Sequence, residues 1–96
     1  VEGEVRLIMA RMSFGEMVDA AFDRIRNSAR GMPCVNARML EIILSLSSHV
    51  HEAKGRAALL RQAEMIGRAS EVIAEPNDRR GVQNLYLAVR RSIDGE

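Results

Sequence analysis

The chain has 96 residues, enough for one domain with a single hydrophobic core, and its charges nearly cancel at a net +1. This balance argues against a nucleic acid as an obligatory partner, and the single cysteine, Cys34, excludes an internal disulfide. The sequence has no run of about 18 uninterrupted apolar residues, so we expect no membrane-spanning segment. Because it begins with Val1 rather than methionine, the chain is consistent with a fragment of a longer protein.

Residues 4–12 form a short apolar run in which apolar and polar side chains partly alternate, a pattern typical of a strand. Its apolar side chains are Val5, Leu7, Ile8 and Met9. No second strand-like segment is visible, so the edge of this strand would meet a second copy, another part of the parent protein, or solvent. We therefore expect residues 1–12 to be an extended arm and residues 4–12 to pair within a dimer. A frayed helix and an arm folded back over its own helices are the alternatives.

The next segment predicts a helix that begins with a capping box, formed by Ser13 and Glu16, and ends at Gly31. Its apolar residues recur at helical spacing and should face the core. They are Phe14, Met17, Val18, Ala21, Phe22, Ile25 and Ala29.

The opposite face of this helix carries Asp19, Asp23, Arg26 and Arg30, with acids before bases. That order complements the helix dipole and allows an Asp23–Arg26 ion pair. Because Asp19 and Asp23 lie one turn apart, their carboxylates could bind a cation or share a proton. We interpret this set as a possible functional polar face, with a solvated, salt-bridged surface as the alternative.

The segment from Met39 to Val50 is apolar on most sides, so we expect it to belong to the central helix of the domain. Pro33 suits the first position of that helix, which should end near residues 47–49. A third helix is expected over residues 56–74, ended by Pro76. Its inward positions are Leu59, Leu60, Ala63, Ile66, Ala69, Ser70 and Ile73. Within it, Ala63, Gly67 and Ser70 form a strip of small residues that would let a neighbouring helix approach closely.

A fourth helix is expected to begin at a cap formed by Asn77 or Asp78 and to stop near Gly95. Its apolar face comprises Val82, Leu85, Tyr86, Val89 and Ile93. The sequence therefore predicts an all-α fold, a four-helix array over residues 13–96 preceded by the extended arm.

Few residues suggest chemistry. His49, His51 and Glu52 resemble a partial zinc site, but no second cluster supplies further ligands, so two solvated histidines are the better interpretation. Cys34 near a helix start has no companion base and fits a packed, inert thiol. We therefore expect no catalytic residue, no metal and no cofactor.

Residues 13–26, Ser-Phe-Gly-Glu-Met-Val-Asp-Ala-Ala-Phe-Asp-Arg-Ile-Arg, resemble the F-x-x-(L/M)-(L/V)-D-x-A-F-D-x-I-R segment of a bacterial family of predicted membrane proteins of unknown function. Residues 38–41, 57–63 and 75–79 agree with further stretches of that family. The resemblance covers roughly residues 5–94 and implies the soluble C-terminal region that follows transmembrane helices. It implies no activity. With the arginine content and free thiol, it indicates the cytoplasmic side of a bacterial inner membrane, or the cytoplasm if the chain stands alone.

The sequence thus favours a non-catalytic, soluble helical domain that mediates self-association or contact with the remainder of the parent membrane protein. A homodimer is the expected state, without direct membrane insertion by this segment. The alternative is a nucleic-acid-binding helical module that uses its arginines, for which the pairs Arg79-Arg80 and Arg90-Arg91 are the candidates.

Overall fold

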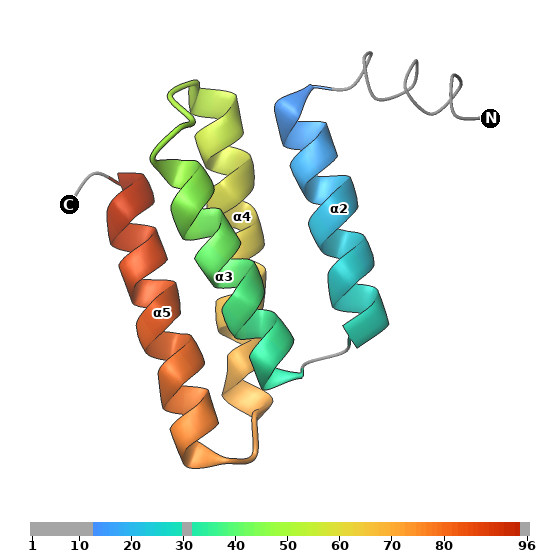
Figure 1. Ribbon diagram of the computed structural model, residues 1–96, viewed down its shortest axis with the longest axis vertical. Helices are drawn as coiled ribbons and strands as arrows, with labels where there is room; N and C mark the ends of the chain where they lie inside the picture. The colour runs from blue at the N-terminus through green and yellow to red at the C-terminus, as the bar shows by residue number, and fades with distance from the viewer. Residues whose placement is uncertain (1–12, 30–31, 95–96) are drawn as a thin grey trace.

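The computed structural model describes residues 13–29 and 32–94, and these form four α-helices and one 3₁₀ turn (Figure 1). The elements are α2 (Phe14–Ala29), α3 (Pro33–Ser47), α4 (Ala53–Ala69), η1 (Ser70–Val72) and α5 (Pro76–Asp94). The predicted all-α four-helix array is therefore confirmed. The expected arm, residues 1–12, lies outside the described residues, as do the expected helix ends at Gly31 and Gly95.

The helices alternate in direction, so α2 and α4 run the same way and α3 and α5 run the opposite way (Figure 1). Helices α3, α4 and α5 pack against one another, and α2 lies at the edge of the array, where it packs mainly against α4. The core side chains come mostly from the three mutually packed helices. They include Met39, Leu40, Ile43, Leu59, Ala63, Ile66, Val82, Val89 and Ile93, joined by Val18 and Phe22 from α2.

The expectation that the segment around Met39 forms the central helix is met only in part. Helix α3 begins at Pro33 and ends at Ser47, as predicted, but α4 is the helix that contacts all of the others extensively. Since α2 packs mainly on α4 rather than on α3, one side of α3 lacks a helical cover, and Ile42 is 41% exposed.

The third and fourth helices differ from their predicted bounds. Helix α4 starts earlier, at Ala53, and ends at Ala69, where the Ser70 hydroxyl donates to the Gly67 carbonyl and the chain tightens into η1. Pro76 then begins α5 rather than ending the third helix. The cap is Glu75, whose carboxylate accepts a 2.7 Å hydrogen bond from the Asp78 N–H, so the predicted caps at Asn77 and Asp78 are wrong.

The predicted strip of small residues comprises Ala63 and Gly67 on α4 and Ser70 in η1, and an aromatic ring from α5 packs against it at Gly67. A Cβ atom placed on Gly67 would lie only 3.0 Å from the ring carbons of Tyr86, so no larger residue fits there without displacing the ring. The close approach predicted for this strip is therefore made by Tyr86, a member of the predicted apolar face of α5.

Helix α2 begins as predicted, with the Ser13 hydroxyl accepting a 3.1 Å hydrogen bond from the Glu16 N–H. Its apolar stripe is only partly covered, however. Val18 and Phe22 are buried, whereas Ala21 is exposed and Ile25 is 40% exposed. One neighbouring helix cannot cover the whole width of this apolar stripe. The prediction that all of its apolar residues face the core is therefore wrong at these two positions and at Met17, which is only partly buried.

Arg56, in the first turns of α4, joins the ends of two other helices. Its guanidinium donates to the carbonyls of Ser47 and Val50 at 3.1 and 2.9 Å, and to those of Ser92 and Ile93 at the end of α5. The Ser47 and Ser92 hydroxyls lie 2.8 Å apart beside it. One cation therefore satisfies terminal carbonyls of both α3 and α5 and complements the negative end of each helix dipole.

Candidate functional site

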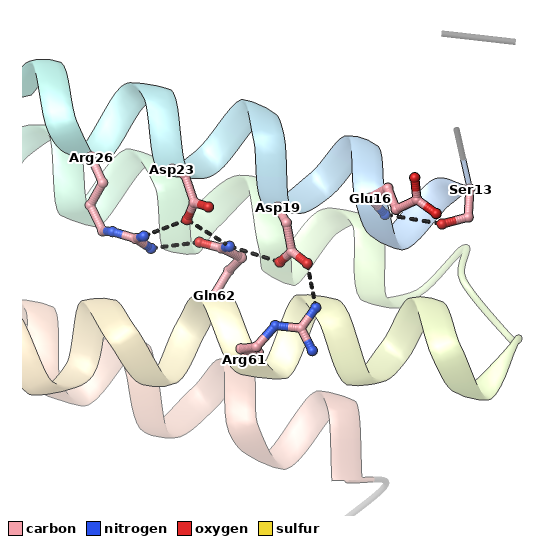
Figure 2. A network of polar contacts seen from close by, with 7 residues as sticks. All are labelled: Ser13, Glu16, Asp19, Asp23, Arg26, Arg61 and Gln62. Carbon is pink, nitrogen blue, oxygen red and sulfur yellow. Dashed lines mark hydrogen bonds and ion pairs between the residues drawn. The ribbon is translucent and has the colours of Figure 1, made fainter. Parts of the chain in front are cut away.

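Three members of the predicted polar face, Asp19, Asp23 and Arg26, lie together against α4 (Figure 2). The fourth, Arg30, lies outside the described residues. The Asp23–Arg26 pair is formed as predicted, at 2.5 Å. This part of the face is not a freely solvated surface, because α4 contributes Arg61 and Gln62 to the same group of side chains.

Gln62 is the centre of this network. Its amide nitrogen donates to Asp19 at 2.9 Å and to Asp23 at 3.2 Å, and its amide oxygen accepts from Arg26 at 2.6 Å. The residue is fully buried, and both of its N–H groups and its carbonyl have charged partners. The reversed amide would direct N–H groups at a guanidinium and an oxygen at two carboxylates, so the charges determine its orientation.

The network lies at the rim of the α2–α4 interface rather than in the core. Asp19 pairs with Arg61 at 2.5 Å, and half of the Arg61 side chain is exposed. Burial alone would raise the pKa of Asp19. Hydrogen bonds from Gln62 and Arg61, together with the charges of Arg61 and Arg26, outweigh this effect and hold the pKa below its ordinary value.

These contacts favour a structural role for the two carboxylates. Each already accepts from an arginine and from the Gln62 amide, so a cation would have to displace protein donors. No group of three or more potential metal ligands occurs among the residues that the structure describes. We conclude that the network fixes α2 on α4.

Replacement of Gln62 by leucine should lower the free energy of unfolding by about 2 kcal/mol, because three hydrogen bonds to charged groups are lost at a buried position. Urea unfolding followed by circular dichroism measures this loss. The matched control is Gln83→Leu on α5, where the half-buried side chain has no hydrogen bond to another described residue. Equal losses in the two variants would contradict the role assigned to Gln62.

The other candidate residues are not brought together. His49, His51 and Glu52 are all exposed in the link between α3 and α4. Cys34 is exposed in the first turn of α3 and borders an open hollow of about 430 Å³ between α3 and α5. The polar side chains that line this hollow with it are Asn77 and Asp78, a set without an imidazole or amine base.

The arginine pairs are largely engaged within the protein. Arg79 donates to the Ile73 carbonyl, Arg80 to the Asn77 side chain, and Arg90 lies 3.7 Å from Asp94. These contacts favour a role at helix ends over a phosphate-binding surface. The proposed association residues Val5, Leu7, Ile8 and Met9 lie outside the described residues.

A second candidate surface is the side of α2 turned away from α4, which we call the outer face of α2. It is defined by Glu16, Met17, Ala20, Ala21, Arg24 and Ile25. Five of these residues are exposed, and Met17 is partly exposed. At about 100° per residue the six spread over about half of the helix circumference, with the small residues Ala20 and Ala21 midway along its length.

Comparisons of the chain with protein-family models, with curated proteins and with solved structures found no match. Within residues 13–29 and 32–94, no helix has the length and apolar character needed to cross a bilayer. A proposal for the function must therefore be argued from the side-chain contacts and exposed surfaces of the four helices.

Proposed function

We propose that this chain is a non-catalytic helical domain that associates with itself through the outer face of α2. The observation that supports this most is the position of α2, which lies at the edge of the array with one main helical neighbour while its apolar stripe extends beyond that contact. Ile25 is 40% exposed on this stripe, and Ala21 beside it is exposed as well. Covering such a surface with a second copy removes apolar area from water.

Two further features support association. The net charge of +1 imposes little repulsion between copies. The Gln62-centred network holds α2 firmly on α4, so the outer face is presented by a fixed helix rather than by a mobile one. In the membrane-protein context that the sequence resemblance implies, the domain would join copies of the parent protein on the cytoplasmic side, and the apolar residues of the arm would add to the contact.

Ile25→Arg should weaken self-association by at least about tenfold, because it places a charge in the apolar part of the contact. Sedimentation velocity over a range of protein concentrations measures the effect. The matched control is Leu87→Arg on α5, where the leucine is 45% exposed and outside the proposed surface. An unsubstituted chain that stays monomeric at every concentration, or two variants that associate like the parent, would contradict this function.

A further inference from the structure

We infer that two copies pair through their α2 helices in an antiparallel, two-fold arrangement, in which Glu16 of each copy faces Arg24 of the other. This inference rests on the proposed function and specifies the partner and its orientation. It comes from the order of side chains along the outer face of α2, in which small residues occupy the centre and opposite charges lie on either side of it.

The spacing of the charges is symmetric about Ala20. Glu16 precedes Ala20 by four residues and Arg24 follows it by four, so each lies about 6 Å from Ala20 along the helix axis. A two-fold axis at Ala20 reverses the second helix and brings its Arg24 to the level of Glu16 in the first. Both charges are exposed, and the symmetry forms the same ion pair twice.

The apolar residues of this face are arranged about a different position from the charges. Met17 and Ile25 lie four residues before and four residues after Ala21, which is about 100° around the helix from Ala20, so a two-fold axis at Ala20 does not pair Met17 with Ile25. Because Ala20 and Ala21 between them are small, the two helices can approach closely at the centre. The charged contacts, rather than the apolar ones, therefore specify the pairing about Ala20.

A parallel arrangement in register has the opposite electrostatic outcome. It would place Glu16 against Glu16 and Arg24 against Arg24, and like charges face one another at a cost. The charge pattern of this face therefore selects the antiparallel orientation. A 16-residue helix is about 24 Å long, so a contact made by α2 alone is small and the dimer should be weak and salt-sensitive.

Charge reversal tests the pairing directly. Glu16→Arg and Arg24→Glu should each reduce self-association at least tenfold, roughly the effect of two like-charge contacts per dimer. Mixing the two variants in equal amounts should restore association, because every facing pair then joins a carboxylate to a guanidinium. The chain that carries both substitutions should also associate like the parent. Sedimentation equilibrium, with circular dichroism to verify folding, gives these values.

Glu71→Arg and Arg80→Glu serve as matched controls, since both residues are exposed and lie outside α2. These two variants should associate like the parent, alone and mixed. A mixture of the α2 variants no tighter than either variant alone would overturn the antiparallel pairing. If Ile25→Arg still weakened association in that case, the proposed function would stand and only the pairing would fail. A monomeric parent chain would overturn both.

Discussion

Ile43→Asp should abolish the folded state. Ile43 is fully buried in α3, so the substitution removes about 1.5–3 kcal/mol of apolar burial and places a carboxylate among the apolar side chains of the core. The combined loss is comparable to the whole stability of a small domain, about 5–15 kcal/mol. Far-ultraviolet circular dichroism at 25 °C should therefore show a largely unfolded chain.

The neighbouring residue supplies the control for this experiment. Ile42 precedes Ile43 on the same helix and is 41% exposed, so the carboxylate of Ile42→Asp remains in water and the fold should persist. A folded Ile43→Asp variant that melts close to the parent temperature would contradict the packing described for α3.

Arg56→Met should lower the free energy of unfolding by about 3–4 kcal/mol, since it removes donors from four carbonyls at the ends of α3 and α5. Methionine preserves much of the apolar stem, which separates loss of hydrogen bonds from loss of packing. Arg56→Lys should recover only part of the loss, because one ammonium group cannot reach all four oxygens. Urea unfolding midpoints measure each variant.

Arg91→Met is the matched control for Arg56, because Arg91 is exposed near the end of α5. Its midpoint should lie close to that of the parent. If Arg56→Met were no more destabilising than Arg91→Met, the guanidinium would not be what holds the two helix ends.

Local signals in the sequence predicted the helices well. Ser13 and Pro33 mark the starts of α2 and α3 by local effects. The Ser13 hydroxyl accepts from the N–H of Glu16 in the first turn, and the ring of Pro33 fixes its own backbone in a conformation that suits a helix start. The region before α5 was less predictable. Glu75, Asn77 and Asp78 are all able to cap a helix, and the choice of Glu75 depends on where the η1 turn directs the chain.

In the polar network, too, the sequence predicted the local contacts but not those between helices. The Asp23–Arg26 pair spans three residues of one helix and follows from spacing alone. The contacts of Gln62 with Asp19, and of Arg56 with Ile93, join residues about 40 positions apart, so they depend on which helices become neighbours. The signal for Gln62 was an amide beside Leu59 and Ile66 on the inward side of its helix, where a buried polar group requires partners.

Cysteine cross-linking at the outer face of α2 tests self-association most directly. In a Cys34→Ser background, Ala20→Cys places a thiol at the proposed two-fold axis, where two copies bring their thiols within disulfide reach. Mild oxidation should convert most of this variant to a covalent dimer, whereas Ala88→Cys, at an exposed position on α5, should remain mostly monomeric. Equal cross-linking of the two variants, or none at Ala20→Cys, would contradict self-association with α2 helices paired at Ala20.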